Sequence, residues 1–164
     1  MTPQKLKPAV VQMLTERLGD EYKAHYFYKC AANYCNNIGF TKAGSFFTNE
    51  SQSELEHAQG LMDYLIGWNI APTIPKVDTN YTIDGLVDAI EKAYELEYDL
   101  FIQYTECSKK MIVADLNTFD FLQKYRIIQT DAVTEYSDFL NALELIDNED
   151  KFQLFVFEKE NFNV

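Results

Sequence analysis

Apolar residues recur at steps of three and four along four long stretches of the chain, which is the spacing of one face of an α-helix. The predicted helices begin and end at about residues 8 and 38, 41 and 68, 82 and 110, and 117 and 146. No comparable stretch alternates with the period of a β-strand. The pattern therefore predicts an all-α chain with four long helices.

Residues typical of helix ends stand at the ends of these stretches. Pro8 suits a first helical turn, and Gly39 can adopt the left-handed conformation that ends a helix. We expect Thr41 to cap the second helix, and Asn117 or Thr118 to cap the fourth. These residues support the predicted boundaries independently of the apolar pattern.

Residues 71–81 form a long connection and include two of the four prolines. An extended segment of about eleven residues covers about 36–40 Å, and a helix of about 28 residues is about 42 Å long. This segment can therefore return the chain to the end at which the bundle began. Residues 151–164 are apolar enough for a short fifth helix. We predict a single domain over residues 1–164, a four-helix bundle with one long crossover between the second and third helices.

Composition and charge exclude several classes of protein. The 164 residues are 47% hydrophobic and 15% aromatic, which argues against disorder and suits one domain. A net charge of −12 argues against nucleic acid as a main partner. No apolar run is long enough for a membrane span or a signal peptide. Cys30, Cys35 and Cys107 form no CxxC pair, so we interpret them as reduced thiols of a cytoplasmic protein.

Polar residues interrupt each apolar stripe near the middle of its helix. They are Glu21 in the first helix, Glu54 and His57 in the second, Glu97 in the third and Gln129 in the fourth. Positions halfway along the helices of a bundle meet at one height, so these side chains are expected in one buried layer. Buried carboxylates repel one another and take up protons, and two divalent cations would remove that repulsion. The alternative is a polar layer that only fixes the register of the bundle.

Three further polar residues have two interpretations each. His25 lies one turn from Glu21, and we interpret it as a hydrogen-bonded core histidine, with an accessory ligand or transit site as the alternative. Glu50 and Glu56 lie off the core stripe, where glutamates are ordinarily solvated. Their alternative role is the transfer or nucleation of metal.

With these residues the chain resembles the non-haem ferritins over nearly its whole length. The segments that carry the resemblance are Asp20-Glu21-Tyr22 with Tyr28, Glu54-Leu55-Glu56-His57 with 62–65, Tyr94–Glu97, and Phe119–Tyr125 before Gln129. The resemblance implies a ferroxidase centre of the heavy-chain type. In such a centre Glu21, Glu54 and His57 would bind a first iron, and Glu54 and Glu97 a second. Tyr28 would hydrogen-bond near the site and act in electron transfer, and Gln129 would orient water or dioxygen.

By the same resemblance, the chain is expected to oxidise Fe(II) to Fe(III) with dioxygen or peroxide, using two iron atoms per subunit. The ferric product would be stored as mineral inside a homo-oligomer, a 24-subunit cage. Leu55 stands where bacterioferritins carry a haem-binding methionine, so no haem is expected. Ser53, Ile128 and Ala132 replace three ligands of a third iron site, which should be weak or missing. The alternatives are a non-storing diiron oxidase or peroxide scavenger, and a purely structural bundle.

Overall fold

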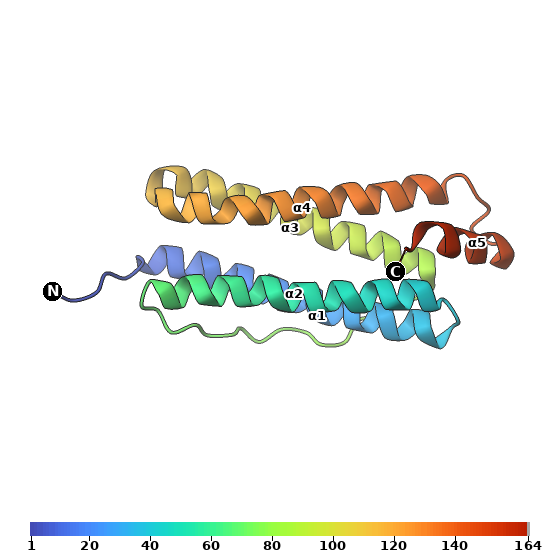
Figure 1. Cartoon of the computed structure of the whole chain (residues 1–164), viewed down its shortest axis with the longest axis horizontal. Coiled ribbons are helices and arrows are strands. Elements are labelled where there is room, and N and C mark those ends of the chain that lie inside the picture. The colour runs from blue at the N-terminus through green and yellow to red at the C-terminus, as the bar shows by residue number, and fades with distance from the viewer. Residues whose placement is uncertain (164) are drawn as a thin grey trace.

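The computed structural model describes residues 1–163, and over that range the chain forms five α-helices and no strand. They are α1 (Pro8–Asn37), α2 (Thr41–Gly67), α3 (Leu86–Ala114), α4 (Leu116–Leu143) and α5 (Lys151–Asn161), as Figure 1 shows. No helix in this range is long and apolar enough to cross a bilayer. The prediction of an all-α fold with four long helices and a short fifth is confirmed.

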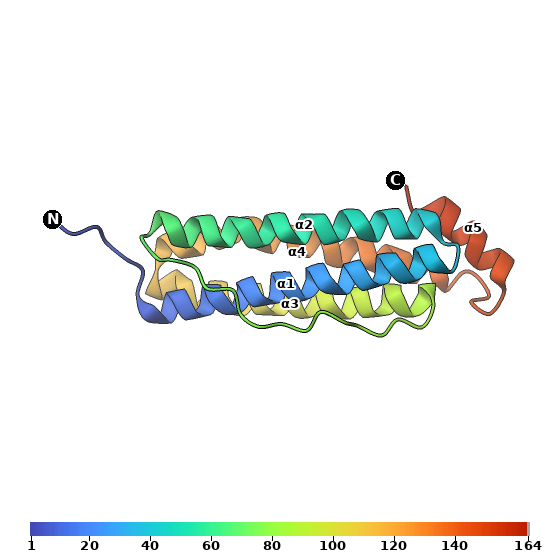
Figure 2. The same cartoon turned by 90° about the horizontal axis from the view of Figure 1, so that it is seen from below.

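The four long helices form two antiparallel hairpins, α1 with α2 and α3 with α4, which lie side by side in an elongated bundle (Figure 1). The chain passes from the first hairpin to the second through residues 68–85, which run along the outside of the bundle (Figure 2). This crossover packs closely on α1, because a Cβ atom added to Gly19 would lie 3.3 Å from Cγ of Pro75. The predicted crossover is therefore confirmed, although it is longer than residues 71–81.

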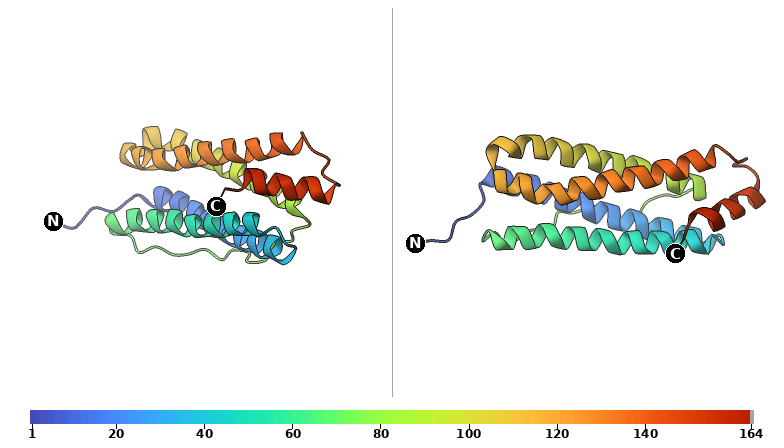
Figure 3. Two further views of the ribbon diagram at one scale, coloured as in Figure 1. Left: turned by 45° about the vertical axis from the view of Figure 1, so that its right-hand side comes forward. Right: turned by 45° about the horizontal axis from the view of Figure 1, so that its top comes forward.

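The turn between α1 and α2 depends on one glycine and on a side chain from α5. Gly39 has a φ of 96°, the left-handed conformation expected at this helix end. Thr41 is the first helical residue rather than the cap, so that prediction is wrong. Oε1 of Glu158, a buried α5 residue, instead accepts the Lys42 N–H at 3.0 Å. A carboxylate at this position satisfies a free N–H group and complements the helix dipole. Figure 3 shows α5 beside the start of α2.

The second hairpin is shifted along the sequence relative to the prediction. α3 begins at Leu86 rather than near residue 82, because Gly85 has a φ of 112° and ends the preceding extended segment. α4 is capped by Asp115, whose Oδ1 accepts the Thr118 N–H at 3.1 Å. Asn117 and Thr118 are therefore not the cap, because an aspartate was available at the position where helical geometry begins.

Large buried side chains fill the space between the two hairpins. Within each hairpin the helices pack closely, whereas backbone approach between the hairpins is largely restricted to α1 and α3. Four tyrosines in this space are at most 1% exposed, namely Tyr28, Tyr104, Tyr125 and Tyr136. Aromatic side chains of this size keep the hairpins apart at mid-height, where the polar layer lies.

Candidate metal centre

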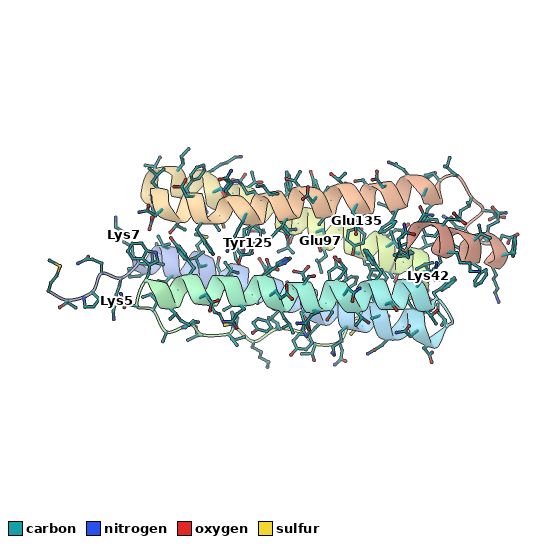
Figure 4. All side chains as sticks on the ribbon, viewed as in Figure 1. Lys5, Lys7, Lys42, Glu97, Tyr125 and Glu135 are labelled. Carbon is teal, nitrogen blue, oxygen red and sulfur yellow. The ribbon has the colours of Figure 1, made fainter. Side chains whose placement is uncertain are left out.

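The predicted polar layer lies in the middle of the bundle. Glu21 is fully buried, and Glu54, Glu97 and Gln129 are at most 3% exposed. The His57 side chain is 21% exposed, so it forms the solvent side of the layer. In the view of Figure 4, Glu97 and Tyr125 lie between the two hairpins. The structure therefore places all five residues of the predicted polar layer at one height and on four different helices.

A first potential metal site is formed by Glu21 on α1 with Glu54 and His57 on α2, whose ligand atoms lie within 4.8 Å of one another. Nδ1 of His57 is 2.9 Å from Oε2 of Glu54 and 3.6 Å from Oε2 of Glu21. Oε2 of Glu21 is buried and has no hydrogen-bond partner within residues 1–163. An unpartnered buried carboxylate oxygen is costly, and a cation between these three groups would remove that cost.

A second potential metal site is formed by Glu50, Glu54 and Glu97, again with ligand atoms within 4.8 Å of one another. Glu54 belongs to both groups, so its carboxylate can bridge two cations. The interpretation of Glu50 as a solvated residue off the core stripe is wrong, since Glu50 precedes Glu54 by one helical turn and lies on the same face. The layer thus contains two adjoining sites with one shared ligand.

Side chains behind the carboxylates hold them in place. Tyr28 Oη donates a hydrogen bond to Oε1 of Glu97 at 2.5 Å, and Nε2 of Gln129 donates to Oε2 of the same residue at 2.7 Å. Tyr104 Oη donates to Oε1 of Glu21 at 2.5 Å. Sequence reasoning placed Tyr104 on the core stripe of its helix but missed this contact. Hydrogen-bonding partners of this kind orient metal ligands.

The ring of Tyr104 stacks on that of Tyr125, with ring centroids 5.1 Å apart and an interplanar angle of 15°. Tyr125 Oη in turn donates to the backbone carbonyl of His57 at 2.8 Å. This contact needs the glycine at position 60, because a Cβ atom there would lie 2.6 Å from Tyr125 Oη. The two tyrosines therefore link α3 and α4 to the helix that carries the histidine.

We expect a Gly60→Ala variant to be less stable than the parent protein by about 1–3 kcal/mol, the usual cost of overpacking. The added methyl group would displace the Tyr125 hydroxyl from the His57 carbonyl. Gly67→Ala is the matched control, because a Cβ atom on Gly67 meets nothing within 4 Å. Alanine is the better helix former, so the control should be neutral or slightly stabilising. Denaturant unfolding of both variants measures the difference, and equal stabilities would contradict the assignment.

Burial and mutual repulsion control the protonation of the layer. Burial and the charges of Glu21 and Glu97 raise the pKa of Glu54 well above its ordinary value. Burial opposes ionisation of Glu21 as well, but the neighbouring His57 and Glu54 side chains lower its pKa below the ordinary value. Burial raises the pKa of Glu97 against the lowering effect of hydrogen bonds from Tyr28 and Gln129. Without a cation, the layer therefore retains protons that a metal must displace.

His25 is a core histidine, as interpreted from the sequence. Its Nδ1 lies 2.7 Å from the Ser51 carbonyl oxygen and 2.9 Å from the Ser51 hydroxyl. The Ser51 hydroxyl also donates to the His25 carbonyl oxygen at 3.0 Å. These contacts join α1 to α2 beside the polar layer, so His25 has a structural role in this conformation.

Comparison with known proteins identifies the fold and the family. A sequence model described as a ferritin-like domain matches residues 11–146. The chain belongs to the ferritin family. Its curated relatives include a bacterial non-heme ferritin from Escherichia coli, 26% identical over 142 residues, or 85% of this chain and 86% of the relative. A bacterial non-heme ferritin from Staphylococcus aureus is 22% identical over 160 residues, or 94% of both chains.

A solved structure similar to this ferritin is described as a novel open pore ferritin from Archaeoglobus fulgidus. The two chains superpose with a TM-score of 0.90 at 25% identity, over 98% of this chain and 99% of the other. The predicted resemblance to the non-haem ferritins is therefore confirmed. The identities are low, so the chemistry of this ferritin must be argued from its own residues.

Proposed function

We propose that this ferritin oxidises Fe(II) to Fe(III) at the two adjoining sites in mid-bundle and stores the ferric product inside a homo-oligomeric shell. The observation that supports this proposal best is the sharing of Glu54 between two buried groups of ligands. A shared carboxylate places two metal ions close together, which is the arrangement of carboxylate-bridged di-iron bundles. Iron is then the substrate that this site binds and oxidises.

The ligand types suit iron oxidation. Carboxylate oxygens are hard, anionic ligands that favour hard cations, and an imidazole suits Fe(II). Anionic oxygen ligands stabilise the ferric state relative to the ferrous state, so binding at these groups favours oxidation. Each of the two Fe(II) ions loses one electron, and dioxygen takes up both electrons and two protons to leave as hydrogen peroxide. Protons displaced from the carboxylate layer by metal binding are available for this uptake.

Several side chains act by positioning in this proposal. The hydrogen bonds from Tyr28 and Gln129 keep both oxygens of Glu97 oriented. Tyr104 does the same for one oxygen of Glu21, and leaves its Oε2 directed towards His57. The partial exposure of His57 gives small molecules access from solvent.

The experiment that tests the proposal is aerobic addition of Fe(II) to metal-free protein, followed by the absorbance of ferric species. We expect oxidation at about neutral pH to be much faster with protein than in protein-free buffer. Equal rates would refute the ferroxidase proposal. The retention of soluble ferric iron by the protein after gel filtration then tests storage separately from oxidation.

Native mass spectrometry of the same sample tests the shell. α5 exposes three large apolar side chains, since Phe152 is 72%, Phe155 44% and Val156 39% exposed in the single chain. Surface of this kind is typical of a contact between subunits, and we expect a 24-subunit cage. A dimer that oxidises iron and retains none would favour the alternative function, a non-storing diiron oxidase or peroxide scavenger.

We expect Tyr28→Phe to fold normally and to oxidise Fe(II) more slowly, by about ten-fold. The substitution removes the hydrogen bond to Glu97 and also any electron that the phenol supplies, and loss of a partner behind a metal ligand typically costs 10–100-fold. Tyr26→Phe is the control, because Tyr26 lies two residues earlier on α1 and is only half-buried. Stopped-flow absorbance measures both rates, and a Tyr28→Phe rate equal to that of the control would remove Tyr28 from the site.

A further inference from the structure

Glu50 is a residue of this ferritin for which the bundle core gives no structural explanation. It lies on α2 one turn before Glu54, and its carboxylate lies within 4.8 Å of ligand atoms on Glu54 and Glu97. Three carboxylates at this separation repel one another strongly unless they bind protons or a cation.

No lysine or arginine neutralises this group. Within residues 1–163, the ion pairs of lysines and arginines involve Asp20, Asp88 and Glu106. The imidazole of His57 contacts Glu21 and Glu54, which belong to the first site. Within residues 1–163, Glu50 and Glu97 therefore form no ion pair with a lysine or arginine. Glu97 is buried and Glu50 half-buried, and carboxylates in such surroundings without a cationic partner favour a cation supplied from outside the protein.

An independent observation points to a polar ligand in the same place. The Tyr136 hydroxyl is fully buried and has no hydrogen-bond partner within residues 1–163. Its ring is nearly parallel to that of Tyr28, with an interplanar angle of 11° and centroids 6.3 Å apart. The hydroxyl of the stacked Tyr28 donates to Oε1 of Glu97, so Tyr136 lies beside the same carboxylate group. A buried hydroxyl without a partner needs an explanation, and a water on a bound cation provides one.

Among the described residues, α4, the helix opposite, contributes no residue to either group of potential ligands. Gln129, the polar residue of α4 in the layer, donates its amide group to Glu97. One turn further along is Ala132, which has no ligand atom. Glu135 is also on α4, but its carboxylate belongs to neither group of potential ligands. Glu54 and Glu97 thus provide two protein ligands, and the third carboxylate within 4.8 Å of them is that of Glu50 on α2.

We propose that Glu50 is the third carboxylate ligand of the second metal position, together with Glu54 and Glu97. This assignment rests on the proposed function, whose second site it completes. It makes the two positions chemically different, because the first contains an imidazole and the second contains carboxylates alone. Imidazole suits transition metals such as Co²⁺, whereas an all-carboxylate set suits harder cations. The first position should therefore fill first with Co²⁺.

Anaerobic titration of the metal-free protein with Co²⁺, followed by the absorbance of the bound ion, tests the proposal without any redox reaction. We expect the parent protein to bind two Co²⁺ per chain. Glu50→Gln should retain the first binding event and weaken the second by ten-fold or more. Glu50→Asp, which keeps the carboxylate on a shorter side chain, should lose less than Glu50→Gln.

Glu56→Gln is the matched control, because Glu56 is an exposed glutamate on the same helix and should bind both ions like the parent. Unchanged binding of two ions by Glu50→Gln would overturn the assignment. Normal binding of two ions combined with slow iron oxidation would also overturn it, and would place Glu50 on a transit route. Failure of the proposed function can be distinguished from failure of the Glu50 assignment. In the first case the parent protein itself would bind Co²⁺ weakly or oxidise no iron.

Discussion

A Glu54→Ala, His57→Ala double variant is expected to fold but to oxidise Fe(II) at a rate close to that of protein-free buffer. The first substitution removes the ligand shared by both metal positions, and the second removes the imidazole of the first position. Loss of a side chain that hydrogen-bonds to a metal ligand typically lowers metal affinity or activity by about 10–100-fold. Loss of the ligands themselves should therefore lower the oxidation rate by more than about 100-fold. Stopped-flow absorbance of ferric species measures the rate, and circular dichroism confirms the helical content.

The matched control for this variant is Glu56→Ala, Gln59→Ala on the same helix. Both control residues are exposed and belong to neither group of ligands. The control should oxidise iron as fast as the parent protein. If the two double variants oxidised iron at the same rate, the mid-bundle site would not be the site of oxidation.

The metal-free protein is expected to become less stable as the pH rises from about 5 to about 7.5. Burial, with the neighbouring carboxylates, raises the pKa of Glu54 well above its ordinary value and that of Glu50 to about 7. The folded chain therefore retains protons that the unfolded chain has lost above its pKa of 4.5. Such a group stabilises the fold below the unfolded pKa, and this contribution is lost as the pH rises through the folded pKa.

The other titrating groups of the layer do not reverse this loss of stability with rising pH. Burial opposes protonation of His57, but the nearby Glu21 carboxylate raises its pKa above the ordinary value, which gives a slope of the same sign. The pKa of Glu21 is lowered, so its contribution is complete above the unfolded value and adds no slope in this range. Each proton bound by the folded state alone lowers the free energy of unfolding by about 1.4 kcal/mol per pH unit.

Denaturant unfolding of metal-free protein at the two pH values measures this effect. Addition of Co²⁺ at the higher pH should restore the stability, by about 2.7 kcal/mol per site at a free concentration of about 100 times the dissociation constant. The Glu54→Ala, His57→Ala variant should show a shallower pH slope and little gain from Co²⁺. Stability that rose with pH in the metal-free parent would contradict the pKa shifts described above.

The sequence predicted the helices well and their ends less well, for a physical reason. The apolar period is a property of many residues, so it located α1 and α4 despite their polar interruptions. A helix end depends on one or two contacts. The contact of Glu158 with the start of α2 joins segments 116 residues apart in the sequence, so no local pattern at Thr41 could reveal it.

The same distinction applies to the metal centre. Glu21, Glu54, Glu97 and Gln129 were predictable because each interrupts an apolar stripe at mid-helix. Glu50 stands one helical turn before Glu54, a spacing that could have placed it on the same face, but its proximity to Glu97 of α3 depends on how the two hairpins pack. The Tyr104 contact with Glu21 was missed for a similar reason, because a tyrosine on a stripe gives no sign of which carboxylate its hydroxyl will reach.

The two proposed metal positions also differ in which parts of the fold supply their ligands. Glu21, Glu54 and His57 all belong to the α1–α2 hairpin, so the first proposed position needs no ligand from the other half of the bundle. The second position joins Glu50 and Glu54 of that hairpin to Glu97 of the other. An ion there cross-links the two halves of the molecule, and a transient opening that separates the hairpins would release one ion and keep the other.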